Sequence, residues 1–396
     1  MVQEHLVLDT PELFADGARR LAEGRGPFAV DTERASGFRF DDRVFLLQVR
    51  RRGAGTFLFA PEGHRDELSR TLAPVLTGEQ WVVHAAVTDL PALAWLQLTP
   101  GSLFDTEVAA RIAGFDRVNL AAVVEAATGT TIKKGHGWED WSTTPLPEDW
   151  LRYAAEDVDY LLEAAEFLAE VLDNAGKLEW AEAEFAHIVL THACPPPERD
   201  WRRTKGVLRL KKPLQLAIAR ELWYAREELA IDSDTNPSRL LPDKAIVALA
   251  EAETTAPQVL ARKLDLKPAA RRRAGQYRDL WLQAISQGFA VSVDERPRPV
   301  HRYHEYPPHS LWAECYPEAH ERLRKVNEEL TDLSVRLEVP EANLVSPKAL
   351  RALVWAATES HSVHTLDDAR AFLASHDARG WQIDLVSPLI RRSVLR

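Results

Sequence analysis

FAVDTE, at residues 28–33, is the segment of this chain with the clearest structural and chemical meaning. An apolar run leads into Asp31 and Glu33, two positions apart. Because side chains alternate along a β-strand, residues two apart leave the same face of a sheet. We therefore predict a strand here that presents two carboxylates side by side.

Further acids and one tyrosine follow in segments with their own patterns. Asp89 comes after the apolar run WVVHAA (81–86), and Tyr153 and Asp157 lie four apart in LRYAAEDVDYLL, where a helix would place them on one face. Four acids at one point would repel each other and would be costly to bury as anions. Divalent cations bound by hard oxygen ligands relieve that repulsion, and paired metals are suited to phosphodiester cleavage.

Each of these residues also has a simpler explanation. An isolated Asp or Glu near a strand end is mostly solvated. Asp89 could cap a helix, since Thr88 and Asp89 are both good N-cap residues. A tyrosine in an amphipathic helix usually packs in the core with its hydroxyl at the rim.

The complete set, in this order, resembles the DEDD family of 3′→5′ exonucleases in its tyrosine subclass. Tyr153 to Asp157 matches the Tyr-x-x-x-Asp motif, whereas the sister subclass would need a histidine where this chain has Arg152. The flanking segments resemble ribonuclease D: DTERASGFRFDDRVFLLQ, LFDTEVAARIAG, WEDWSTTPLPEDWLRYAAEDVDYL, GKLEWAEAEF and WRRTKG.

The resemblance implies an α/β ribonuclease H-like domain with a mixed sheet flanked by helices. It implies two divalent cations, Mg²⁺ or Mn²⁺, with Asp31 bridging them and the carboxylates of Glu33, Asp89 and Asp157 as further ligands. Tyr153 would complete the catalytic set by orienting the attacking water, since a phenol with a pKa of about 10 is a poor general base.

The activity that the resemblance implies is the release of nucleoside 5′-monophosphates from the 3′ ends of RNA. Precursors of tRNA are the expected substrate class. Two alternatives remain open: a DNA-directed 3′→5′ exonuclease, and a non-catalytic RNA-binding scaffold on a decayed nuclease fold.

Other polar residues of these segments have structural explanations that we favour. Asp105 is expected to cap a helix or brace the fold, and His84 to be a hydrogen-bonded histidine near the core. Trp141 is expected to pack rather than to stack on a base. Lys133 and Lys134 could contact an RNA backbone or simply be solvated.

We expect four segments along the chain: an exonuclease domain (1–197), an HRDC domain (helicase and ribonuclease D C-terminal; 207–292), a linker (293–309) and a second, diverged HRDC-like domain (310–396). Pro195-Pro196-Pro197 ends a long acidic helical pattern that starts near Glu148 and reaches His192. The first all-α module resembles the HRDC domain, most clearly in NPSRLLPDKAIVALA, and the second is predicted because LEVPEANLVSPKALRALVW aligns with LAIDSDTNPSRLLPDKAIVALA as a degenerate repeat. In the first domain, strands are predicted at 28–33, 44–49, 56–59 and 81–86.

The net charge of −11 is unevenly distributed. Residues 1–196 hold 17 Lys/Arg and 32 Asp/Glu, whereas residues 197–300 hold 20 and 14. The middle of the chain is therefore basic, with clusters at 199–212, 261–263 and 270–273. Basic clusters attract phosphate, so we expect RNA contact there, although a solvated surface is the alternative.

Other global features point to the cytoplasm. No apolar run of about 18 residues predicts a membrane span, and the N-terminal sequence lacks the pattern of a secretory signal. Cys194 and Cys315 lack metal-ligand spacing and do not form a disulfide framework, which fits a reducing compartment. The oligomeric state is open, with a monomer as the expectation.

Overall fold

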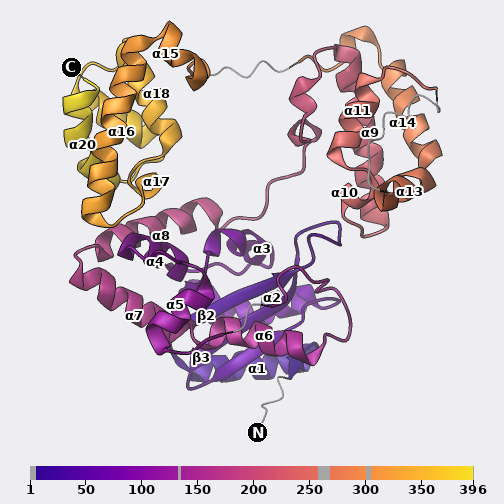
Figure 1. Cartoon of the computed structure of the whole chain (residues 1–396). Helices are drawn as coiled ribbons and strands as arrows, with labels where there is room; N and C mark the ends of the chain where they lie inside the picture. The colour runs from indigo at the N-terminus through magenta and orange to yellow at the C-terminus, as the bar shows by residue number, and fades with distance from the viewer. Residues whose placement is uncertain (1–5, 133–134, 257–267, 300–304, 396) are drawn as a thin grey trace.

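The computed structural model describes residues 6–132, 135–256, 268–299 and 305–395. Three bodies are arranged around a central opening (Figure 1). We call them the sheet domain (residues 6–192), the middle helical domain (199–299) and the C-terminal helical domain (305–395). Several residues lie outside the described ones. They are Lys133 and Lys134, the basic cluster at 261–263 and the linker residues 300–304, which include His301 and His304.

The sheet domain is built on one mixed sheet of six strands, in the order β1-β4-β3-β2-β5-β6. The central strands β2, β3 and β4 are antiparallel neighbours, whereas the pairs β1–β4, β2–β5 and β5–β6 are parallel. The mixed sheet predicted from the sequence is confirmed. The strands span Val7–Leu8 (β1), Arg25–Arg34 (β2), Val44–Arg52 (β3), Gly55–Phe59 (β4), Gln80–Val83 (β5) and Ser102–Asp105 (β6).

Strand β2 separates two environments by its alternation of side chains. Phe28 and Val30 enter a core that they share with helices α1 (Pro11–Glu23) and α2 (Arg65–Leu76). The alternate residues begin with the buried Ala29, which packs against helix α7 (Leu161–Asn174). Asp31 and Glu33 continue that second face, on which helix α6 (Glu148–Asp159) also lies.

Two sequence predictions of element length are wrong. The strand predicted at 81–86 ends at Val83, because Ala85 adopts a left-handed conformation with φ 59°. The long helix predicted from 148 to 192 is three helices, α6, α7 and α8 (Leu178–His192). It turns at Tyr160 and again at Gly176, whose φ of 65° suits a residue without Cβ.

Shorter helices follow the last two strands of the sheet. Helices η1 (Ala86–Thr88) and α3 (Leu90–Trp95) lie between β5 and β6, and α4 (Thr106–Ala113) and α5 (Leu120–Thr128) follow β6.

The middle helical domain is all-α, as predicted. Leu222, Ile246 and Ile285 lie fully buried at its centre. Its elements are η2 (Trp201–Arg203), η3 (Val207–Arg209), α9 (Pro213–Asp232), α10 (Pro237–Leu240), α11 (Asp243–Glu251), α13 (Pro268–Gln276), α14 (Arg278–Ala290) and η4 (Val293–Glu295).

The C-terminal helical domain repeats part of this order. A long helix, a four-residue helix and a third helix that starts at a proline-bearing turn occur in both domains, at the two predicted repeat segments. The C-terminal elements are η5 (His309–Leu311), α15 (Trp312–Cys315), α16 (Pro317–Leu337), α17 (Glu341–Leu344), α18 (Pro347–Thr358), α19 (Leu366–Ser375) and α20 (Gly380–Ser393).

The C-terminal helical domain docks on helix α8 of the sheet domain. Arg379 donates two hydrogen bonds of 2.6 Å to the carboxylate of Glu184, and the indole of Trp381 donates a third at 2.9 Å. The rings of Trp180 and Trp381 stack at 5.2 Å. A bidentate charged pair beside an aromatic stack fixes orientation as well as position.

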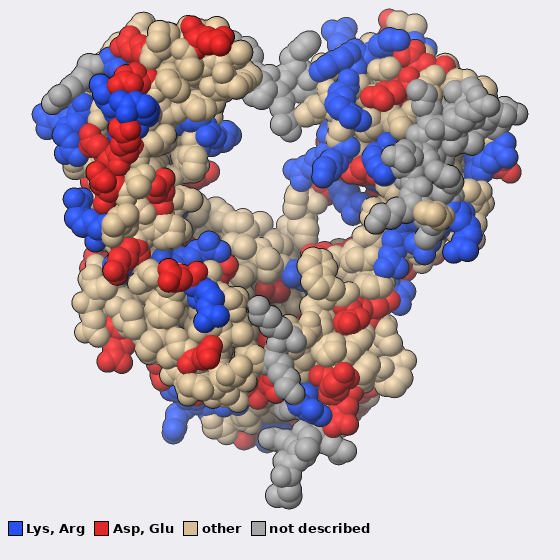
Figure 2. Space-filling view, viewed as in Figure 1, with Lys and Arg blue, Asp and Glu red and all other residues tan. Residues whose placement is uncertain are grey.

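The middle helical domain docks on the loop that follows β2. Asp234 receives hydrogen bonds from Arg43 at 2.6 and 3.0 Å and from Arg39 at 3.3 Å. The backbone N–H of Asn236 donates to the carbonyl of Phe38 at 2.9 Å. The three bodies thus surround an opening, and Lys and Arg gather on the middle helical domain (Figure 2).

Among the helices of the described residues, none combines the length and the apolar character that crossing a lipid bilayer requires. Cys194 and Cys315 are both free and exposed.

Replacing Glu184 with alanine should release the C-terminal helical domain from the sheet domain. The change leaves the Arg379 guanidinium without its charge partner, which should cost about 2–3 kcal/mol of docking free energy. Small-angle scattering should then give a larger radius of gyration, and trypsin should cut between the domains faster. Glu182→Ala, at an exposed position of the same helix, is the control, and equal behaviour of the two variants would contradict the expectation.

Candidate metal-binding active site

Three acidic side chains from two elements meet on one face of the sheet. Asp31 and Glu33 come from β2 and Asp157 comes from α6, and each offers a carboxylate oxygen within 4.8 Å of the other two. Helix α6 can approach this closely because it places the small, fully buried residues Ala154 and Ala155 against the sheet. The structure therefore brings together three of the four carboxylates predicted from the sequence.

The pKa values of these acids show how poorly the protein alone tolerates their charge. Burial raises the pKa of Glu33 to about 9, and the charges of Asp157 and Asp89 add to the rise. The pKa of Asp31 is raised well above its usual range by burial and then by Asp89, Asp157 and Glu33. Burial also raises the pKa of Asp157 to about 7. A bound cation would reverse these shifts, because it favours the ionised form.

Asp89 is a neighbour of this cluster and is not one of its three members. Its carboxylate accepts hydrogen bonds from the hydroxyls of Thr32 at 2.5 Å and Thr88 at 3.0 Å. Arg34 lies 3.5 Å from the same carboxylate. Thr32 and Arg34 are the residues of β2 that alternate with Asp31 and Glu33, so Asp89 is held toward the other side of the strand. The sequence-based analysis did not select Thr32 or Arg34.

Asp89 does not act as a helix cap. It occupies the N-cap position of α3, but its side chain makes no capping hydrogen bond there. The capping explanation, which the sequence left open, therefore does not account for a buried aspartate that is only 3% exposed.

Asp105 supports the turn that leads to Asp89. Its carboxylate caps α4 by accepting from the N–H groups of Glu107 and Val108, and it also accepts from those of Ala85 and Ala86. The prediction that Asp105 braces the fold is confirmed.

His84 lies beside the same turn. It contacts the hydroxyl of Thr106 at 2.9 Å, and burial lowers its pKa to about 4. It is the hydrogen-bonded histidine near the core that the sequence predicted.

Tyr153 stands one helical turn before Asp157 on α6, so the two side chains share a face of the helix. Its ring meets His136 at 5.7 Å and Trp141 at 6.5 Å. Gly135 lies so close that an added Cβ would come 2.9 Å from the tyrosine ring. Burial and the nearby acids raise the pKa of Tyr153 far above its usual value. The hydroxyl therefore stays protonated and can orient a partner by hydrogen bonding.

Trp141 is a packing residue, as predicted. It is 2% exposed, its ring lies tilted against that of Trp150 at 5.2 Å, and its indole N–H donates to the carbonyl of His136 at 3.2 Å. His136 was not selected from the sequence, although it lies in the segment GHGWEDW.

Gln48 also lies beside the acidic cluster, and it was not predicted from the sequence. Strand β3 pairs it directly with Asp31, and it is fully buried. Neither polar atom of its amide has a hydrogen-bond partner among the described residues. An unpaired buried amide costs about 1–3 kcal/mol, which singles out this position beside Asp31. The sequence feature that could have indicated Gln48 is its place as the one polar residue in the apolar run VFLLQV.

The donor set fits a hard divalent cation. Carboxylate oxygens are the ligands that Mg²⁺ and Mn²⁺ prefer, and three of them converge here with raised pKa values. Glu33 and Asp89 are at least nine-tenths buried, so water alone does little to screen the group.

Family models match three segments of the chain. Residues 7–173 match the model of a 3′–5′ exonuclease, residues 215–285 that of the HRDC domain, and residues 305–394 that of a 3′ to 5′ exonuclease C-terminal domain. The fold and the acidic cluster thus define a 3′–5′ exonuclease domain with two helical domains behind it.

Individual proteins that are similar to this chain in sequence or in structure are consistent with a 3′–5′ exonuclease. Ribonuclease D of Gluconacetobacter diazotrophicus is 35% identical over 186 residues, 46% of each chain, so this chain spans about half the length of the relatives it matches. A protein from Bifidobacterium adolescentis of known crystal structure is 30% identical, with a TM-score of 0.82 over 99% of this chain and 97% of that one. Escherichia coli RNase D shares the fold at 19% identity, with a TM-score of 0.67 over 94% of this chain and 99% of that one. The chain therefore carries a 3′–5′ exonuclease domain, and it is similar to ribonuclease D over about half of its length.

The raised pKa values predict an inverted pH dependence for the metal-free protein. A group whose pKa is higher in the folded than in the unfolded state stabilises the fold at low pH, and that contribution is lost as pH rises through the folded value. For Asp157 and Glu33 the folded values are about 7 and about 9. We expect the Tm in chelator to fall by roughly 5 °C between pH 6 and pH 9, and Mg²⁺ to reduce that fall.

The matched variant for this measurement is Glu33→Gln, which keeps the shape of the side chain and removes its titration. Its Tm should change less with pH in chelator than that of the unmodified protein. A Tm that is constant or rises over this pH range in the unmodified protein would contradict the assignment.

Proposed function

We propose that this chain is a metal-dependent 3′→5′ exoribonuclease that releases nucleoside 5′-monophosphates. The proposal rests on the convergence of carboxylate oxygens of Asp31, Glu33 and Asp157 within 4.8 Å of one another. Tyr153 lies one turn before Asp157 on helix α6. A phosphodiester brings further negative charge to this place, so the reaction requires cations there.

We assign to the side chains the roles that the resemblance implies. Asp31, Glu33 and Asp157 would hold two divalent cations, Mg²⁺ or Mn²⁺, with Asp31 shared between them and Asp89 contributing from its neighbouring position. Bound cations supply Lewis-acid activation of water and stabilise the departing oxygen. The protonated hydroxyl of Tyr153 would orient the attacking water.

The contacts of Asp89 with Thr32 and Arg34 bear on its role. Its bonds to Thr32 and Arg34 hold its carboxylate close to the cluster without placing it inside. We infer that these bonds fix the direction from which Asp89 approaches a cation. The same bonds limit how far its side chain can turn.

RNA is the substrate that we propose, with precursors of tRNA as the expected class. The excess of 20 Lys/Arg over 14 Asp/Glu in residues 197–300 supports binding of a polyanion beside an acidic nuclease domain. The order of family models supports the division proposed from the sequence, with domains at 1–197, 207–292 and 310–396 and a linker at 293–309. We further propose that the protein works as a monomer in the cytoplasm.

The test is digestion of a 3′-extended RNA and of single-stranded DNA of the same sequence, each with Mg²⁺, Mn²⁺ or chelator. The proposal expects stepwise loss of 3′ nucleotides from the RNA only when a divalent cation is present. Faster digestion of the DNA would support the DNA-directed alternative. Binding of RNA without digestion under every metal condition would support the scaffold.

Asp31→Ala is the inactive reference for these assays. We expect it to abolish cleavage while RNA affinity changes less than about threefold, because the basic middle segment should supply much of the phosphate contact. Fluorescence anisotropy with labelled RNA measures the affinity. Equal loss of binding and cleavage would contradict this division of roles.

Replacing Tyr153 with phenylalanine tests its role in orienting water. The ring should keep its packing against His136 and Trp141, so we expect a loss of about 100-fold in kcat with little change in KM. Tyr160→Phe, at the residue that joins α6 to α7, is the control. A variant with unchanged kcat would show that the hydroxyl only serves packing.

A further inference from the structure

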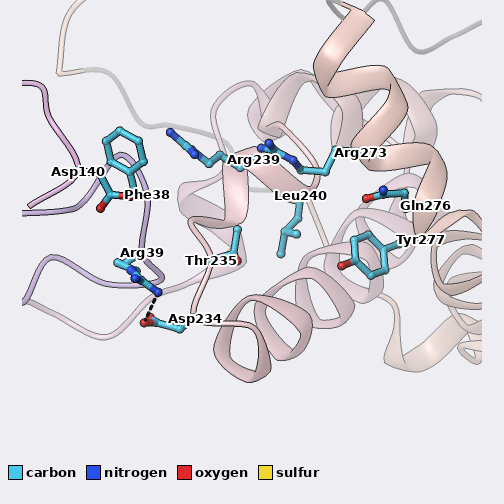
Figure 3. A pocket seen from close by; sticks show the side chains of 10 residues that line it. All are labelled: Phe38, Arg39, Asp140, Asp234, Thr235, Arg239, Leu240, Arg273, Gln276 and Tyr277. Carbon is cyan, nitrogen blue, oxygen red and sulfur yellow. Dashed lines mark hydrogen bonds and ion pairs between the residues drawn. The ribbon is translucent and has the colours of Figure 1, made fainter. Parts of the chain in front are cut away.

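A polar cavity, distinct from the acidic cluster, lies where the sheet domain meets the middle helical domain (Figure 3). Its volume is about 400 Å³, which is within the range of small-ligand pockets. Both domains contribute to its wall. The lining residues are Phe38, Arg39 and Asp140 from the sheet domain and Asp234, Thr235, Arg239, Leu240, Arg273, Gln276 and Tyr277 from the middle helical domain.

Two arginines of this wall have charge to offer a ligand. Neither Arg239 nor Arg273 makes a side-chain hydrogen bond or an ion pair with any described residue. Arg239 lies over the ring of Phe38, with its guanidinium carbon 4.0 Å from the ring centroid. A stacked guanidinium is held in place while its N–H edge stays free to donate.

The acids of the wall are already engaged. Asp234 accepts from Arg43 and Arg39 and from the backbone N–H of Phe40. Asp140 accepts from the hydroxyl and the backbone N–H of Ser142. Arg239 and Arg273 can therefore donate to a ligand, whereas Asp234 and Asp140 already accept hydrogen bonds from the protein. Such a wall is suited to binding an anion.

The remaining lining suits a nucleotide better than a bare anion. Tyr277 is half-buried and offers an aromatic face, and Gln276 is exposed and carries an amide that can both donate and accept. Bases stack on such aromatic faces with little dependence on sequence. In Figure 3, Gln276 and Tyr277 line the part of the cavity opposite Phe38 and Arg39.

The two segments that the sheet domain contributes to the cavity also lead to residues of the acidic site. Phe38 and Arg39 lie in the loop that leaves β2 just after Glu33. Asp140 precedes Trp141, whose ring packs near Tyr153. Arg39 ties these two walls together by donating to the hydroxyl of Ser142 at 2.7 Å.

We propose that this cavity binds an internal phosphodiester of the RNA strand whose 3′ end occupies the acidic site, with Arg239 and Arg273 on the phosphate and Tyr277 beneath a base. The inference rests on the proposed function, since it assigns a second contact to the same substrate. It makes the junction between the two domains part of the substrate-binding surface.

The test compares Arg273→Gln with Arg272→Gln in the full-length chain. Arg272 is its exposed neighbour on α13 and does not line the cavity. For a long single-stranded RNA, Arg273→Gln should raise KM about fivefold, leave kcat nearly unchanged and lower the salt dependence of binding by about one phosphate contact. Arg239→Gln added to Arg273→Gln should raise the KM further.

A short chromogenic substrate, the p-nitrophenyl ester of uridine 5′-monophosphate, separates the two sites because it reaches only the acidic one. The proposal expects its turnover to be unchanged in Arg273→Gln. The proposal is overturned if KM for RNA is the same in the Arg273 and Arg272 variants, or if the ester is turned over more slowly as well.

Failure of the proposed function would be recognised separately. If the unmodified protein cleaves neither substrate with either cation, the exonuclease proposal fails and the cavity is judged by RNA binding alone. Anisotropy with RNA in the Asp31→Ala background then decides the matter: about fivefold weaker binding on adding Arg273→Gln supports the cavity, and unchanged binding overturns it.

Discussion

Repulsion between carboxylates is the constraint around which the sheet domain is arranged. Asp31, Glu33 and Asp157 converge within 4.8 Å, and burial raises the pKa values of all three. A fold that holds such a group without cations loses stability as the groups ionise, so the acids must be forced together by the surrounding packing. That force comes from β2, a central strand of the sheet, and from α6, which packs on it through Ala154 and Ala155.

The surroundings of the cluster divide the work of holding it. Asp105 caps α4 and also fixes the turn before Asp89, so one carboxylate orders the approach of another. The aromatic packing around Tyr153 holds its hydroxyl beside Asp157. Such supporting contacts matter because a cation site tolerates little displacement of its ligands.

The two helical domains attach to the sheet domain by different contacts. The C-terminal helical domain uses a stack of tryptophans and a bidentate pair at Glu184, whereas the middle helical domain uses a half-buried aspartate, Asp234, that is shared between Arg43 and Arg39. Beside the second contact lies a cavity whose Arg239 and Arg273 have no ion-pair partner among the residues that the structure describes. Lys and Arg gather on the middle helical domain although the whole chain carries a net charge of −11, and this local positive charge is the feature on which the proposed binding of RNA rests.

Local patterns in the sequence were sufficient for the mixed sheet, for the all-α character of the later domains and for the pairing of Asp31 with Glu33 and of Tyr153 with Asp157, because each depends on residues a few positions apart. Residue spacing could not show that Asp89 would turn toward Thr32, or that Gln48 would lie opposite Asp31. Those relations join residues far apart in the chain, and only the register of the strands and the packing of the domains decide them.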